Sequence, residues 1–362
     1  MIRDIIRRAF GAAIILLLTL AASAPSGALD LADGRIRLTL HEGIGRFSLS
    51  CQTRGSSGVF VPLLASQDPR TTSVSIVVGN KIYRMGESSE FAEKTERTAG
   101  GGRFIWKSSF LQVTETFTFI ASTGSSMTDG IRIDLSMRNL SEQDIIAGVR
   151  YLFDTYLGES SFVHFRTDAL TQVTHETTLA AADKAAYWVS PLSGDADNFG
   201  LQVMLSGQGV TVPDRVVFAN WKRLSDASWS YETSAIRNFS LLPYSVNDSA
   251  AAQYYDPRPI PRAGESTVTI VLGVNSKSGF GPAAASSQDL SASLQQSLAA
   301  AQTAQDTGQA LRSDLVTVNQ ILSRIDAAVA AGATISDEDL ALLQGALKDL
   351  GGRVSRYSTT GK

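Results

Sequence analysis

The chain has 362 residues, of which 43% are hydrophobic and 19% charged, and its formal net charge is −3. This composition is sufficient for a sizeable core. The charges of both signs are interspersed without a basic cluster, which argues against a nucleic-acid partner. The single cysteine, Cys51, excludes an intramolecular disulfide, so we expect apolar burial to stabilise the fold.

Residues 1–24 have the three parts of a secretory signal peptide. Three arginines precede a short apolar run over 12–20, and small residues end in Ala24. The run is about half of the roughly 20 apolar residues that a membrane-spanning helix needs. We therefore expect cleavage near Ala24, or near Ala28, no integral membrane segment afterwards, and a periplasmic or secreted mature protein.

Residues 30–275 alternate strand-like runs with turn residues. Ile131, Ile133 and Leu135 are separated by polar residues, a pattern typical of a strand with one buried face. We see no helix-period segment here, and no Pro/Gly/Ser-rich linker divides the region. Roughly fifteen strands are expected at this spacing. The sequence thus predicts a mainly β fold, a large two-sheet antiparallel sandwich.

The candidate catalytic residues are few. His164 lies between two apolar residues, so strand alternation predicts that it faces solvent or a groove. His175 and Glu176 are the best acid/base pair by residue type, but adjacent strand residues point to opposite faces and do not converge on one substrate atom. No motif of a nucleophile, a metal site or a cofactor occurs, and we expect none of these groups.

Asp154 lies inside an apolar run over 145–157, where an ionised carboxylate must be paired or hydrogen-bonded. Arg150 or Arg215 could supply that pair, and a structural ion pair is the leading interpretation, with a ligand-binding acid as the alternative. The aromatic residues are candidates for stacking on sugar rings, with core packing as the alternative; they are Trp188, Trp221, Trp229, Tyr231, Tyr254 and Tyr255.

Three short phrases, over 149–155, 213–221 and 247–251, resemble a pattern in uncharacterised exported bacterial β-proteins. These proteins are similar to the two-sheet supersandwich of galactose mutarotases and carbohydrate-active enzymes. The resemblance covers roughly residues 30–275 and implies a sandwich with a sugar-facing sheet. It transfers no catalytic residue, because the histidine acid and glutamate base of mutarotases have no matching motif in this chain.

The composition changes near residue 281, and we expect a linker over 276–288 followed by a helical segment over 289–357. Apolar residues recur there with heptad spacing, which predicts a helical hairpin or a coiled coil. The predicted seam consists of Leu311, Leu315, Val318, Leu322, Ile325, Val329, Leu340, Leu343, Leu347 and Leu350. These helices can fold back on each other or meet another chain.

Two classes of function follow from the sequence. The preferred one is a non-enzymatic envelope protein, a β-sandwich binding or scaffold module whose helical tail contacts a second copy or a protein partner. The alternative is a carbohydrate-binding or carbohydrate-active protein, related to epimerases or lyases, that uses a groove on the sandwich to hold a glycan.

Overall fold

The structure is a computed structural model that describes residues 27–53, 59–123, 125, 127–159, 161–168, 172–183, 185–192, 199–276, 279–280 and 348. The expected signal peptide over 1–24 lies outside the described residues. So does the expected helical segment over 289–357, apart from Lys348. Among the described residues, no helix is long and apolar enough to cross a membrane.

The described residues form eighteen strands, and all pairings between them are antiparallel, so the fold is mainly β. The strands are β1 Ala28–Asp33, β2 Ile36–His41, β3 Arg46–Gln52, β4 Phe60–Pro62, β5 Ser73–Val78, β6 Lys81–Arg84, β7 Ala92–Thr98, β8 Gly101–Lys107, β9 Leu111–Ile120, β10 Gly130–Asn139, β11 Ile145–Thr155, β12 Arg166–Thr167, β13 Thr177–Ala180, β14 Tyr187–Pro191, β15 Gly200–Met204, β16 Arg215–Asn220, β17 Ser249–Ile260 and β18 Glu265–Val274.

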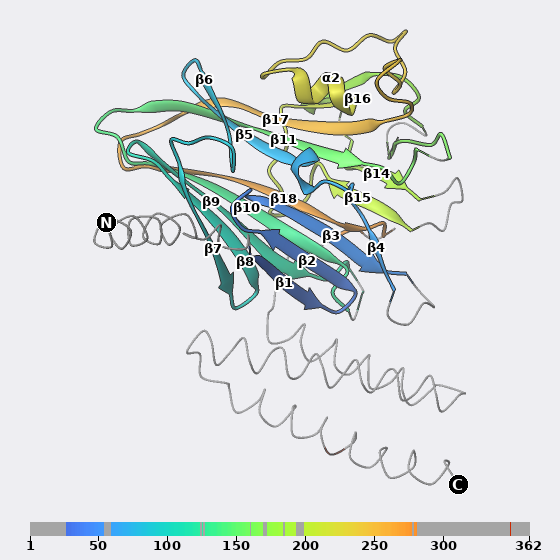
Figure 1. Cartoon of the computed structure of the whole chain (residues 1–362), viewed down its shortest axis with the longest axis horizontal. Coiled ribbons are helices and arrows are strands. Elements are labelled where there is room, and N and C mark those ends of the chain that lie inside the picture. The colour runs from blue at the N-terminus through green and yellow to red at the C-terminus, as the bar shows by residue number, and fades with distance from the viewer. Residues whose placement is uncertain are drawn as a thin grey trace, which may run out of the picture.

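These strands make three sheets, not the two that the sequence predicts. Eight strands follow the order β12-β14-β15-β18-β10-β9-β8-β7, six follow β13-β16-β17-β11-β5-β6, and four follow β1-β2-β3-β4. Figure 1 shows the six-stranded sheet at the top, with β1, β2 and β3 lower in the view; β1 contacts β7 and β8 of the eight-stranded sheet. Because the six-stranded sheet is the narrower of the two, part of the eight-stranded sheet needs another cover.

The four-stranded sheet supplies that cover. Phe47 on β3 packs against Phe117 on β9, with ring centroids 5.0 Å apart. Strands β9 and β10 alternate buried and partly exposed residues, as their sequence predicts, and the buried set faces the other two sheets. In contrast, β11 is buried over most of its length, because a chain segment also covers the outer face of the six-stranded sheet.

A buried carboxyl group joins the three sheets. Glu115 on β9 accepts a hydrogen bond from the Tyr151 hydroxyl on β11, and both residues are at most 2% exposed. Arg46 on β3 is also 2% exposed and its charge favours the ionised carboxylate. Burial nevertheless dominates and raises the pKa of Glu115 to about 7.

The segment over 221–248 leaves the six-stranded sheet between β16 and β17 and packs on its outer face. We call this segment the excursion. It begins with the helix α2, Trp221–Asp226, whose cap is Asn220: the Asn220 side chain accepts from the Arg223 backbone N–H at 3.3 Å. Sequence analysis predicted no helix in this region and was wrong, because six residues are too few to show a helical period.

Candidate functional site

Three carboxylates lie where β11 ends and β17 begins. Asp154 stands opposite Ala250 at the end of β11. Glu159, just after that strand, accepts a hydrogen bond from the Ser249 backbone N–H at 3.0 Å. Asp248 directly precedes β17, and we call Asp154, Glu159 and Asp248 the carboxylate cluster.

Burial shifts the titration of all three groups upward. It raises the pKa of Asp154 and of Glu159 to about 7 each, and the negative charge of Asp248 adds to both shifts. Burial also raises the pKa of Asp248. A Thr71 hydrogen bond and the Ser249 N–H act in the opposite direction but are weaker.

Asp154 does not form the expected ion pair, so that prediction was wrong. Arg150 donates to the carbonyl oxygens of Leu224 and Ala227, the latter at 2.8 Å, and Arg215 pairs with Asp256 at 2.7 Å. The physical reason is distance along the strand. At about 3.3 Å per residue, four residues place the Arg150 and Asp154 backbones about 13 Å apart.

Arg215 is equally remote, because it stands in the same row as Arg150. In the register of the sheet both arginines face Tyr254, and the Arg215 guanidinium lies 4.1 Å from the centre of its ring. Among the described residues, no ion pair connects a carboxylate of the cluster to a lysine or arginine. The cluster therefore carries carboxylates without a compensating cation.

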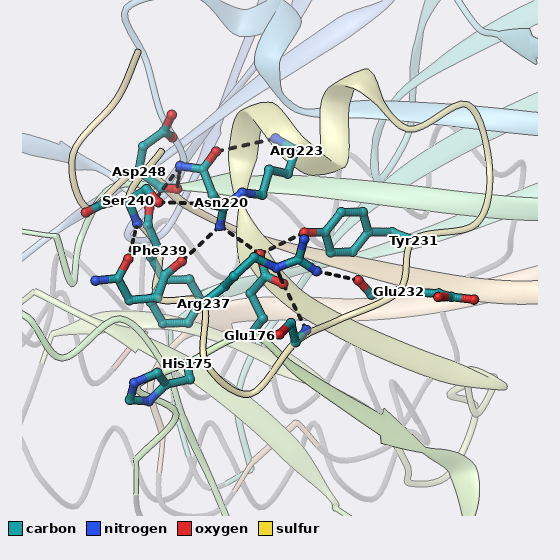
Figure 2. Close-up of polar contacts among 12 residues, drawn as sticks. His175, Glu176, Asn220, Arg223, Tyr231, Glu232, Arg237, Phe239, Ser240 and Asp248 are labelled. Atoms are coloured by element: carbon teal, nitrogen blue, oxygen red, sulfur yellow. Dashed lines mark hydrogen bonds and ion pairs between the residues drawn. The ribbon is translucent and has the colours of Figure 1, made fainter. Parts of the chain in front are cut away.

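Glu176 is the centre of a second polar group, shown in Figure 2. Its side chain is fully buried, and it forms ion pairs of 2.8 Å with Arg223 and with Arg237. The Tyr231 hydroxyl donates to it at 2.7 Å and the Ser234 backbone N–H at 3.1 Å. Every acceptor of this carboxylate is used within the protein, which indicates that Glu176 anchors the excursion to the sheet.

The excursion in turn positions Asp248. The Asn220 amide donates to the carbonyl oxygens of Phe239 and Asp248, at 2.8 and 2.9 Å, and to the Ser245 hydroxyl at 2.9 Å (Figure 2). Ser245 also hydrogen-bonds the Asp248 side chain, which favours its ionised form. Hydrogen bonds thus connect Glu176 to Asp248 through Arg223 and Asn220.

The histidine candidates do not meet at one site. His175 is exposed, its neighbour Glu176 is buried, and Figure 2 shows the His175 ring pointing away from the network, so the two do not converge. His164 is 4% exposed, which corrects the expectation that it faces solvent or a groove. Its ring lies 4.5 Å from that of Phe239, and burial lowers its pKa to about 4.

The backbone of His164 nevertheless lies close in space to the backbone that leads into Glu159 of the carboxylate cluster. A Cβ added at Gly158 would lie 2.7 Å from the His164 Cα, so the two backbones touch, and Gly158 immediately precedes Glu159. The His164 Nδ1 atom is buried and makes no hydrogen bond with the described residues. The neutral ring is therefore part of the apolar support behind this edge of the sheet.

The aromatic candidates divide between two places. Trp188 is fully buried between the sheets, against Phe153, Phe165 and Phe218. Trp221 and Trp229 are partly exposed and pack in the apolar cluster on the outer face of the six-stranded sheet, as does Tyr231, whereas Tyr254 and Tyr255 are buried.

Trp221 is the aromatic candidate that borders the carboxylate cluster. Its Nε1 donates to the Thr71 carbonyl oxygen at 3.0 Å, and its backbone N–H donates to the Asp248 carbonyl oxygen at 2.9 Å. Thr71 also hydrogen-bonds the Asp154 side chain. Trp221 is therefore linked to Asp154 through Thr71 and to Asp248 through its own backbone.

Sequence analysis did not single out Glu159 or Asp248. Both follow recognisable signals, since Glu159 comes two residues after the apolar run that holds Asp154, and Asp248 lies in a phrase already noted for its resemblance. The sequence pattern does not predict that β11 pairs with β17, and this pairing brings the two distant segments together.

The cluster suits hydroxyl groups better than a metal ion. Among the described residues, no group of three or more His, Cys, Asp or Glu is arranged to hold a metal. A carboxylate accepts hydrogen bonds when ionised and donates one when protonated, and groups that titrate near pH 7 can do both. Such an edge can bind a neutral ligand that presents several hydroxyls.

Comparison with known proteins gives weak likenesses to solved structures and no sequence match. No protein-family model matches the sequence, and no curated protein matches it significantly. Among solved structures, a galactose mutarotase related enzyme from Lactobacillus acidophilus has 10% identity and a TM-score of 0.41, over 71% of this chain and 100% of that one. A polysaccharide lyase has 11% identity and a TM-score of 0.39, over 70% and 34% of the two chains.

A 4-alpha-glucanotransferase from Thermococcus litoralis has 8% identity and a TM-score of 0.34, over 70% of this chain and 42% of the other. These likenesses give a weak, partial match to the mutarotase-related fold, as the sequence resemblance suggested. They carry no argument about the site.

Proposed function

We propose that this protein binds a saccharide at the carboxylate cluster, and that it does so as an exported protein. The observation that carries the proposal is the cluster itself. Asp154, Glu159 and Asp248 lie together where β11 ends and β17 begins, without a cation. A buried or half-buried carboxylate needs hydrogen-bond donors or a counter-charge. Within the protein, Thr71, the Ser249 N–H and Ser245 supply donors to these groups. Ligand hydroxyls supply further donors.

The surroundings of the cluster favour a sugar over a cation or a basic peptide. The partly exposed indole of Trp221 offers an apolar surface beside the carboxylates, and its orientation is fixed by the Thr71 hydrogen bond. Binding sites for small molecules combine such apolar surface with a few fixed polar groups. A pyranose ring, with an apolar face and a rim of hydroxyls, presents both features.

Raised pKa values are a further argument for function at this edge. Perturbed carboxylates that do not belong to a structural ion pair concentrate at functional sites. Glu176 is the useful contrast, because its carboxylate is fully buried and forms ion pairs with two arginines. The cluster keeps its carboxylates without a cationic partner at a cost in stability, and ligand binding explains why it does so.

Binding to a broad set of immobilised glycans tests the proposal. The mature chain, labelled at its terminus, is compared with the Asp154→Asn variant and with Glu232→Gln, which changes an exposed carboxylate of the excursion by the same chemistry. We expect wild type and Glu232→Gln to bind the same glycans and Asp154→Asn to lose them. Equal binding by all three proteins, or none by wild type, would contradict the proposal.

A further inference from the structure

The excursion exposes an unusual amount of apolar surface. Four large side chains within eleven residues project into solvent, with Ile236, Leu242, Tyr244 and Val246 exposed to 91%, 74%, 72% and 65%. We call these four residues the apolar rim. Single exposed apolar residues are normal in soluble proteins, but a concentration of this kind marks a surface that another element covers.

The rim cannot retract by local rearrangement without breaking hydrogen bonds. Leu241 and Ser245 exchange two backbone hydrogen bonds of 2.9 Å, and the Tyr244 N–H donates to the Leu241 carbonyl oxygen at 2.7 Å. The Ser245 hydroxyl is held by the Asn220 amide at 2.9 Å. The loop that carries the rim is therefore braced on the body of the protein, and its apolar side chains are presented outward.

The chain leaves the described fold at the same end of the sandwich. Strand β17 starts beside the excursion, runs to the far end, and is followed by a short turn and then β18, which returns (Figure 1). The C-terminal end of β18 thus lies at the end where β17 began. Phe280 packs beside Gly273 on the outer face of the eight-stranded sheet, opposite to the excursion, so the chain that follows must pass around the sandwich to reach the rim. Residues 281–310 can span about 45 Å even as a helix, which exceeds the width of two sheet layers about 10 Å apart.

An apolar counterpart exists farther along the same chain. The sequence over 311–329 has apolar residues at spacings of four, three, four, three and four, a pattern that predicts one continuous stripe on a helix. A tethered segment competes at an effective concentration that reaches the millimolar range. A second copy of the protein at micromolar concentration is at a disadvantage against such a tether.

We propose that the apolar rim is the docking surface for the C-terminal segment of the same chain. The contact is made by the stripe that consists of Leu311, Leu315, Val318, Leu322, Ile325 and Val329. Because Ser245 in the rim loop also hydrogen-bonds Asp248, the docked segment lies beside the carboxylate cluster. This proposal stands on the rim and the stripe, independently of saccharide binding.

Disulfide trapping in the full mature chain tests this contact. The double variant Tyr244→Cys/Val318→Cys places one thiol in the rim and one in the stripe. The native Cys51 is buried, and burial raises its pKa to about 12, so it does not compete. The matched control Tyr244→Cys/Gln320→Cys moves the second thiol off the stripe. Circular dichroism verifies that each variant keeps its strand content.

Under mild oxidation we expect an intramolecular disulfide in the Val318 variant that forms at least tenfold faster than in the Gln320 control. Mass spectrometry identifies the bond, and denaturing electrophoresis separates internal links from linked dimers. Adding Leu315→Asp and Leu322→Asp to the trapping variant should suppress the bond. Equal rates in the two variants, no bond in either, or a bond found only in dimers would overturn the proposal.

Discussion

Replacement of Asp154 by asparagine should make the unliganded protein more stable while it weakens ligand binding. The substitution keeps the shape of the side chain and removes a charge that burial disfavours. Burial raises the pKa of Asp154 from 3.8 to about 7 in the folded protein. At about 1.4 kcal/mol per pKa unit, three units correspond to about 4 kcal/mol of folding free energy.

The sign of the effect depends on pH. The pKa of Asp154 is higher in the folded protein than in the unfolded chain. The stability that its protonated form contributes is therefore fully present below pH 3.8 and is lost as the pH rises to about 7. Asparagine has no charge to lose. The advantage of Asp154→Asn should therefore be close to zero at pH 4, about 2 kcal/mol at pH 5.5 and about 4 kcal/mol at pH 8.

Urea unfolding of the protein at these three pH values measures the difference directly. Contributions from Glu115 and the other carboxyl groups are common to both proteins and largely cancel. Glu232→Gln is the control, and its exposed side chain should leave the pH dependence unchanged. Destabilisation by Asp154→Asn at pH 8, or an advantage that does not change with pH, would refute the reasoning.

Three further outcomes are expected from the buried groups. Glu176→Gln should lower the free energy of unfolding by about 2–4 kcal/mol, because two arginines lose their partner and one of them is partly solvated; urea unfolding with the exposed Glu232→Gln as reference checks this. Tyr151→Phe should cost about 1–3 kcal/mol, since it leaves Glu115 without its donor, and unfolding at pH 5 and pH 8 should show the larger loss at pH 8, where the carboxylate is ionised. Burial lowers the pKa of His164 from 6.5 to about 4, so the stability that the neutral ring contributes is present above pH 6.5 and is lost as the pH falls to 4. Wild type should therefore lose stability over this range relative to His164→Phe. Parallel plots of unfolding free energy against pH for the two proteins would contradict the assignment.

Local pattern was enough to predict the class of the fold. Alternation at Ile131, Ile133 and Leu135 correctly identified a strand with one buried face, and the buried faces of β9 and β10 follow the same rule. The number of sheets could not be predicted in this way. Which strands pair is decided by contacts between distant segments, as when Phe47 packs on Phe117, and periodicity carries no information about that choice.

The same limit applied to the site. Asp154 could be recognised as unusual from its apolar neighbours, but its environment depends on Asp248, which the β11–β17 pairing brings close. His164 was misplaced because alternation predicts an exposed face only where one side of the strand meets water. Here the excursion supplies Phe239 on that side, so the ring is buried as well.

The most direct test of the central claim is calorimetric titration of the tightest-binding glycan at pH 7 into wild type, Asp154→Asn and Glu232→Gln. Hydrogen bonds to charged groups contribute about 1.5–3 kcal/mol, which is roughly 10- to 100-fold in affinity. We predict that Asp154→Asn binds the glycan more weakly by this factor and that Glu232→Gln binds it with unchanged affinity. An unchanged affinity in Asp154→Asn would show that the saccharide binds elsewhere.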